Sequence, residues 1–328
     1  MKRREFLKTA GIMSASTFVG DAFAGDKETH SQQSNFAQNQ KLLMNPDPKF
    51  KGRFIEGAGG IKLFVEEIGD PKNPAILFIH GFSQCRLSWD RQFTSDLAKQ
   101  FHLVRMDIRG HGLSDKPRDP IAYQEGKNWA DDVQATINAF NLNRPVLCGW
   151  SYGGFIMCDY VRHHGQQAIA GLNFVCCPTE IGPHAPQNAV GEEFLALMPG
   201  FFSTDAIESS TALQKFMEMV FYEPLTPQDF YFFLGFNTIV PPYVRQGLFA
   251  RQIDNVAVLK SLTLPVLITQ GEADRLVFRP YADFIAGHIP HASNTYYPKC
   301  GHSPFFEVAS RFNQDLAKFV RQSNIKKG

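Results

Sequence analysis

The chain of 328 residues carries 33 basic and 32 acidic side chains, a formal charge of +1, and its composition is 44% hydrophobic. This near-neutral balance argues against nucleic acid or an anionic membrane surface as a partner. The chain is long enough to bury a core of its own, so its six cysteines are not needed as disulfide staples.

The first 24 residues have the form of an export signal. Arg3 and Arg4 precede Phe6-Leu7-Lys8, a weakly apolar stretch follows, and Ala22-Phe23-Ala24 offers the small residues of a cleavage site. We expect a twin-arginine signal peptide over residues 1–24, cleaved near Ala24, and a periplasmic or secreted mature protein. We expect no membrane anchor in that mature form, because the apolar stretch is too short to span a bilayer.

Residues 25–51 are rich in polar residues with few apolar ones and predict a flexible linker. A hairpin over residues 53–67 follows, and strands then alternate with helices. Strands are predicted at residues 76–79, 103–107, 146–149, 170–175, 266–269 and 294–297, and helices at 89–100, 128–140, 152–164, 280–287 and 304–322. This alternation predicts an α/β core, with a mostly parallel sheet, over residues 52–177 and 255–322.

The turn after the strand at residues 146–149 predicts a nucleophile. Gly149-Trp150-Ser151-Tyr152-Gly153 is a G-x-S-x-G pattern between a buried strand and a helical stretch. Such a turn projects the serine hydroxyl from the end of the sheet, and its small residues let it close. The pattern alone is weak in a chain with 26 glycines, but its flanking strand and helix make it specific. Ser151 is therefore the predicted nucleophile.

Residues 178–254 interrupt the alternation with helical runs that are dense in phenylalanine, which predicts a helical insertion; at this place in the chain, the resemblance named below implies a helical cap. Phe230-Tyr231-Phe232-Phe233 is apolar on every helical face, so some of these rings must pack on the main domain or line an apolar pocket. The candidate pocket residues are Trp150, Phe194, Phe202, Phe230 and Phe233, although packing beneath the turn is the favoured alternative for Trp150. Arg245 and Arg251 are interpreted as solvated surface residues, with contact to an anionic substrate group as the alternative.

An acid and a histidine follow Ser151 along the chain. Asp274 comes directly after the strand at residues 266–269, and His302 precedes the last amphipathic helix. A serine hydroxyl needs an imidazole to take its proton, and that imidazole needs a carboxylate to fix its tautomer. Ser151, His302 and Asp274 are the predicted catalytic residues. Glu180 and Asp283 are the alternative acids.

These motifs, together with His80-Gly81-Phe82 and the segment 107–114, resemble the α/β-hydrolase superfamily over roughly residues 52–322. The resemblance implies an eight-stranded, mostly parallel sheet with a helical cap. It also implies an oxyanion hole made by the backbone N–H groups of Phe82 and Tyr152. His80 and the residues Asp107, Arg109 and His111 are expected to order loops near the site rather than to react.

The form Gly-Trp-Ser-Tyr-Gly-Gly is similar to the branch of small esterases, cofactor-free perhydrolases and carbon–carbon-bond hydrolases. We expect a serine hydrolase that cleaves a small hydrophobic carboxylic ester through an acyl-enzyme, without a cofactor. A carbon–carbon-bond hydrolase, a perhydrolase and a ligand-binding receptor on the same scaffold are the alternatives. No pair of histidines has metal-ligand spacing with a carboxylate and no C-x-x-C occurs, so no metal is predicted. Cys85 and Cys300 could form a disulfide, but free thiols are preferred.

Overall fold

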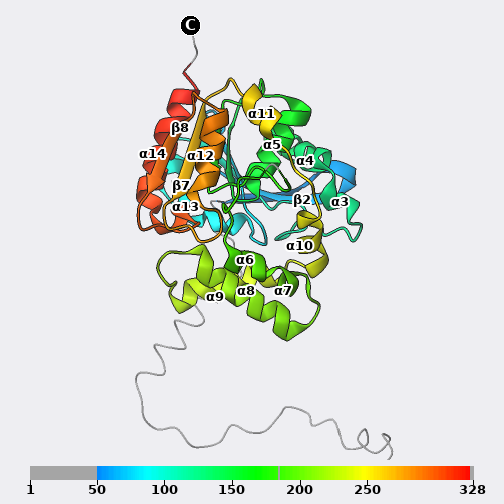
Figure 1. The fold of residues 1–328 in the computed structure, drawn as a ribbon. Coiled ribbons are helices and arrows are strands. Elements are labelled where there is room, and N and C mark those ends of the chain that lie inside the picture. The colour runs from blue at the N-terminus through cyan, green and yellow to red at the C-terminus, as the bar shows by residue number, and fades with distance from the viewer. Residues whose placement is uncertain (1–49, 184, 326–328) are drawn as a thin grey trace, which may run out of the picture. The chain divides into compact units, whose positions relative to one another are not determined.

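The computed structural model describes residues 50–183 and 185–325 (Figure 1). The predicted signal peptide, its cleavage site and almost all of the predicted linker therefore lie outside the described residues. Residue 51, the last of the predicted linker, already belongs to the first strand. None of the helices among the described residues has the length and the apolar run needed to cross a membrane.

An eight-stranded sheet forms the centre of the described chain, with the strand order β1-β2-β4-β3-β5-β6-β7-β8. The strands are β1 (Lys51–Glu56), β2 (Lys62–Ile68), β3 (Ala75–Ile79), β4 (His102–Met106), β5 (Val146–Trp150), β6 (Gly171–Val175), β7 (Val266–Gly271) and β8 (Ser293–Tyr297). The pairs β1·β2 and β2·β4 are antiparallel, and the other five pairs are parallel. The predicted fold class is confirmed.

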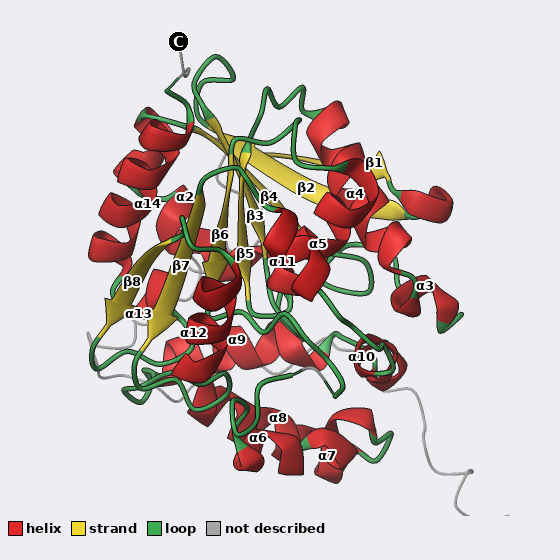
Figure 2. Cartoon of the chain, turned by 45° about the horizontal axis from the view of Figure 1, so that its top comes forward, coloured by secondary structure: helices red, strands yellow, loops and turns green. Residues whose placement is uncertain are grey.

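Helices cover both faces of the sheet, which explains why β3, β5 and β6 are buried along their whole length (Figure 2). On one face lie α4 (Gly126–Ala139), α5 (Gly153–His164), α11 (Val256–Ser261) and α12 (Arg279–His288). On the other lie α2 (Asp90–Phe93), α13 (Pro304–Glu307) and α14 (Ala309–Ser323). The short α3 (Ile121–Gln124) precedes α4.

Two predicted helices are wrong as continuous elements. The segment 89–100 consists of α2 between two 3₁₀ turns, Arg86–Trp89 and Asp96–Lys99. The Thr94 hydroxyl bonds back to a carbonyl of α2, and the Ser95 hydroxyl caps the following turn, so local side-chain bonds replace a longer helix. The segment 304–322 is divided at Val308, whose φ of −125° and ψ of 43° are not helical.

The cap consists of α6 (Glu192–Ala196), α7 (Met198–Phe202), α8 (Ala206–Val220), α9 (Pro227–Thr238) and α10 (Pro242–Phe249), all between β6 and β7. These helices lie beyond the carboxyl ends of the parallel strands (Figures 1 and 2). The interpretation of Arg245 and Arg251 as surface residues is wrong, because only 2% and 5% of their surfaces are exposed. Arg245 donates to carbonyls of Phe201 and Asn237 and so joins three cap helices.

Candidate active site

Ser151 lies at the apex of a strained turn between β5 and α5. Its φ is +52°, a left-handed conformation that is unfavourable for a residue with a Cβ. The Ser151 N–H donates to the carbonyl of Val175 in β6 at 2.9 Å, which ties the turn to the neighbouring strand. A Cβ on Gly153 would lie 2.7 Å from the carbonyl oxygen of Ile79, so the close approach of α5 to β3 requires glycine there. The sequence pattern and the backbone geometry thus agree.

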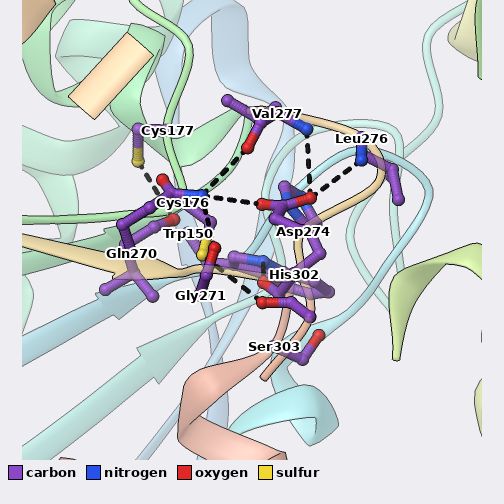
Figure 3. A network of polar contacts seen from close by, with 12 residues as sticks. Trp150, Cys176, Cys177, Gln270, Gly271, Asp274, Leu276, Val277, His302 and Ser303 are labelled. Atoms are coloured by element: carbon purple, nitrogen blue, oxygen red, sulfur yellow. Dashed lines mark hydrogen bonds and ion pairs between the residues drawn. The ribbon is translucent and has the colours of Figure 1, made fainter. Parts of the chain in front are cut away.

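Asp274 lies in the loop after β7, and hydrogen bonds to both of its carboxylate oxygens hold the carboxylate in one orientation (Figure 3). Oδ1 accepts from the N–H groups of Leu276 and Val277 at 2.8 and 3.0 Å. Oδ2 accepts from Nε2 of Gln270 at 3.2 Å and lies 2.7 Å from Nδ1 of His302. With both oxygens occupied by donors, the carboxylate is fixed toward the imidazole.

His302 is buried, and its backbone is anchored on both sides. Its N–H donates to the Val220 carbonyl at 2.9 Å, and its carbonyl accepts from Nε1 of Trp150 at 2.8 Å. Because Asp274 is an acceptor, Nδ1 of His302 carries the proton of that contact and Nε2 is left as a base. This is the tautomer that a serine nucleophile needs.

Glu307 of α13 holds the histidine loop, and sequence reasoning did not find it. Its carboxylate accepts from the N–H groups of Gly301 at 3.0 Å and of Ser303 at 3.2 Å, the two neighbours of His302. The other oxygen accepts from the N–H of Tyr222 in the cap at 2.7 Å. An acid five residues after a loop histidine is a weak sequence signal, because helices often begin with acidic residues.

A cavity of about 260 Å³ opens onto Ser151 and is almost entirely apolar. Its wall combines the turn, the start of the cap, the acid loop and the end of α10. The lining residues are Phe82, Ser151, Tyr152, Phe155, Pro178, Glu180, Ile181, Gly182, Ala185, Val190, Phe194, Leu195, Phe249, Leu276, Val277 and Tyr281. Ser151 therefore faces a space suited to an uncharged, hydrophobic group.

Of the five predicted pocket residues, Phe194 lies in this wall, and Trp150, Phe202, Phe230 and Phe233 do not. Trp150 packs beneath the turn, with its ring 5.6 Å from the histidine ring. Phe233 lies 5.0 Å from a ring of α13, so it packs the cap on the main domain. The ring of Phe202 lies 6.1 Å from the ring of Phe249, which lines the cavity. The ring of Phe230 lies 5.7 Å from the ring of Tyr231. Dense aromatic patterning predicted burial, but not which ring faces the cavity.

The N–H groups of Phe82 and Tyr152 belong to two segments that meet at Ser151. A Cβ on Gly81 would lie 2.9 Å from Cβ of Ser151, so the loop after β3 directly touches the turn. Neither N–H is used in the hydrogen bonds between backbone groups of the described loops and turns. Tyr152 immediately precedes α5, where the helix dipole favours negative charge. The two predicted donors therefore belong to segments that meet at the turn of Ser151.

His80 and His111 brace the loop that carries Phe82. Nε2 of His80 accepts from the Ile108 N–H at 3.1 Å, and Nε2 of His111 accepts from the Ser83 N–H at 3.2 Å. Burial lowers the pKa of each of these histidines to about 3. Both are therefore neutral supports at physiological pH.

This pair makes the fold sensitive to acid. In the unfolded chain each imidazole takes up a proton near pH 6.5, whereas the folded protein resists protonation down to about pH 3. The stabilisation is complete above pH 6.5, and the free energy of unfolding falls by about 1.4 kcal/mol per pH unit for each histidine below it. Urea unfolding between pH 7 and 5 measures this slope. NMR of histidine-labelled protein should show at least two imidazoles that do not titrate above pH 4; titration of every imidazole near pH 6.5 would contradict the prediction.

The alternative acids contact other partners. Glu180 accepts from the N–H of Asn255 at 3.0 Å with both oxygens, and burial raises its pKa to about 7. Asp283 is exposed on α12 and lies 3.6 Å from Arg279. Neither has a hydrogen bond to His302, whereas Asp274 does.

Cys176 is the third ligand-type side chain beside Asp274 and His302, with donor atoms within 4.8 Å of one another. Burial and the neighbouring carboxylate of Asp274 raise the pKa of its thiol well above the ordinary value. Within this group, Oδ2 of Asp274 and Nδ1 of His302 are already bonded to each other at 2.7 Å. All six cysteines, Cys85 and Cys300 included, are free and buried.

Comparison with known proteins assigns the chain to a family. The sequence model of the alpha/beta hydrolase fold family matches residues 74–309. The bifunctional esterase/perhydrolase DCH of Acinetobacter calcoaceticus is 25% identical over 292 residues, covering 82% of this chain and 99% of the relative. The non-heme chloroperoxidase of Burkholderia pyrrocinia is 26% identical over 293 residues, with 82% and 99% coverage.

A solved structure agrees with these relatives. The esterase RhEst1 from Rhodococcus sp. ECU1013 superposes with a TM-score of 0.78 at 30% identity, over 83% of this chain and 99% of the esterase. The chain therefore belongs to the alpha/beta hydrolase fold family.

Proposed function

We propose that this protein hydrolyses small hydrophobic carboxylic esters through an acyl-enzyme on Ser151, with His302 as general base and Asp274 as its orienting acid. The observation that carries the proposal is the 2.7 Å contact between Asp274 and Nδ1 of His302. The carbonyl of His302 accepts from Nε1 of Trp150, the residue before Ser151, and Ser151 itself lines the apolar cavity. The strained turn at Ser151 adds support, because backbone strain persists only where the surrounding structure enforces it, and such positions cluster at active sites.

The reaction proceeds in two halves. Nε2 of His302 takes the hydroxyl proton of Ser151 as the oxygen attacks the ester carbonyl, and Asp274 stabilises the imidazolium that forms. The N–H groups of Phe82 and Tyr152 donate to the oxyanion, each contributing about 3–4 kcal/mol to the transition state. The alcohol leaves with the proton from His302. Water, deprotonated by His302, then attacks the acyl-enzyme and releases the acid.

Perhydrolysis is the second candidate, favoured by the esterase/perhydrolase relative. In that case hydrogen peroxide replaces water in the second half, and the acyl group leaves Ser151 as a peracid. The same residues act in both reactions, so the ratio of peracid to acid formed from one ester with and without peroxide separates them.

The volume of the cavity predicts a preference for short and medium acyl chains. We expect hydrolysis of p-nitrophenyl esters by the purified protein to rise with chain length until the cavity is filled and then to fall. Phe194→Ala should move the optimum to longer chains, because this ring lines the cavity. Phe230→Ala removes a cap ring outside the wall and serves as the matched control with an unchanged optimum.

The outcomes of this series distinguish an esterase from a carbon–carbon-bond hydrolase and from a ligand-binding receptor. An unchanged optimum in Phe194→Ala would mean that the acyl chain does not occupy this cavity. Turnover of no ester, with Ser151 still labelled by a fluorophosphonate, would point to a carbonyl substrate outside the ester class, as in the carbon–carbon-bond hydrolases. Absence of labelling would refute the serine mechanism and favour a ligand-binding receptor.

A further inference from the structure

Arg251 lies where the cap returns to the main domain, two residues after α10. Nη2 of its guanidinium lies 2.8 and 2.7 Å from the two carboxylate oxygens of Asp159 in α5. Nη1 lies 3.4 Å from the hydroxyl of Tyr152, the residue directly after the nucleophile. Arginine and aspartate are both buried, so one fork-shaped cation joins the cap's return segment to the turn and its helix.

The side chain of Tyr152 is fixed along its whole length. Its hydroxyl donates to the carbonyl of Leu248 in α10 at 3.0 Å. Its ring packs between Trp129 at 5.8 Å and Phe155 at 5.1 Å. A residue held at both ends of its side chain has little freedom to turn its own N–H, which is the donor proposed for the oxyanion.

The same return segment also supports the other donor. Phe249 follows Leu248, and its ring lies 4.9 Å from the ring of Phe82. Both rings line the cavity. If the end of α10 moved, Phe82 would therefore move with it through the ring contact with Phe249, and Tyr152 through the hydrogen bond of its hydroxyl to Leu248.

We propose that Arg251 is a positioning residue that fixes the end of the cap against Tyr152 and so holds both oxyanion donors in place beside Ser151. The inference rests on the proposed serine mechanism. Removing one oxyanion donor outright costs about 10²–10³-fold in kcat, so loosening the donors should cost part of that. The acyl group contacts the apolar wall, so KM should change much less than kcat.

Tyr152→Phe removes the hydroxyl that contacts both Arg251 and the carbonyl of Leu248. It keeps the ring, the backbone N–H and the pair of Arg251 with Asp159. We expect kcat, and the rate at which a fluorophosphonate labels Ser151, to fall roughly 10-fold, with KM within about 3-fold. Tyr160→Phe is the matched control. It removes a tyrosine hydroxyl in α5, the helix that follows Tyr152, and this hydroxyl bonds Gln134 at 3.1 Å. It should keep wild-type rates.

Arg251→Lys separates positioning from stability. A lysine keeps a charge for Asp159, but a single ammonium cannot also reach Tyr152 as the planar guanidinium does. We expect a thermal unfolding midpoint close to that of the wild type and a labelling rate lowered about as much as in Tyr152→Phe. The double variant should be no slower than Tyr152→Phe alone, because Tyr152→Phe already removes the contact that Arg251→Lys removes.

Arg162→Met is the control for the arginine. Arg162 joins α5 to Asn255 at 2.7 Å in the same return segment but does not contact Tyr152. It should leave the labelling rate unchanged. Wild-type labelling rates in both Tyr152→Phe and Arg251→Lys would overturn the inference. A wild-type protein that is not labelled at all would refute the proposed function instead.

Discussion

Ser151→Ala is expected to lower kcat by roughly 10³-fold or more while the protein stays folded. In the proposed mechanism the hydroxyl oxygen forms the acyl-enzyme, so the variant should retain at most the contribution of the oxyanion hole and of substrate binding. KM should change little, because the cavity wall is intact. Alanine keeps the Cβ and relieves none of the left-handed strain at this position. The thermal unfolding midpoint should therefore lie near that of the wild type.

The experiment compares ester hydrolysis and intact mass after fluorophosphonate treatment. The wild type should gain the mass of one phosphonyl group, and Ser151→Ala should gain none. Ser303→Ala is the matched control, because this buried serine neighbours His302 and its hydroxyl has no partner within the described residues. It should keep both turnover and labelling. Near-normal esterase activity in Ser151→Ala would exclude Ser151 as the nucleophile.

The sequence predicted the fold class and the turn at Ser151, because both depend on local patterns. The strand at residues 146–149 runs directly into the turn, and the glycines there are required by contacts shorter than a Cβ allows. Asp274 could be placed at the same edge of the sheet because it follows a parallel strand. Hydrophobic runs and chain order carry this information without any knowledge of distant contacts.

The cavity could not be predicted in the same way, because it depends on how the cap packs. Phe194 and Phe233 are both buried aromatic residues of the cap, yet one lines the cavity and the other packs on α13. Arg251 gave no sequence signal beyond its charge, since its partner Asp159 is 92 residues away. Such pairings follow from tertiary packing, which overrides what a single segment suggests.

Glu307 could not be predicted from the sequence for a similar reason. Its carboxylate bonds three backbone N–H groups, and a backbone partner leaves no trace in the side-chain sequence. The same holds for Leu276 and Val277, which orient Asp274 through their N–H groups alone. Sequence patterns therefore locate polar side chains such as Asp274 better than the backbone groups that hold them.

Asp274→Asn is expected to lower kcat by about 10⁴-fold, the loss seen when a serine hydrolase keeps its geometry but holds its histidine in the wrong tautomer. The N–H groups of Leu276 and Val277 keep the asparagine oxygen where Oδ1 now lies. The asparagine NH₂ must then face His302, so Nδ1 becomes an acceptor and the proton moves to Nε2. A protonated Nε2 cannot take the proton of Ser151.

The two alternative acids provide the discriminating comparison. Asp283→Asn changes an exposed carboxylate on α12 and should leave kcat unchanged. Glu180→Gln changes an acid that lines the cavity and bonds Asn255, so it should affect KM more than kcat. Measured kcat values for the three variants decide the assignment. A loss near 10⁴-fold in Glu180→Gln, with Asp274→Asn close to wild type, would transfer the orienting role to Glu180, because one acid in the triad has to fix the imidazole.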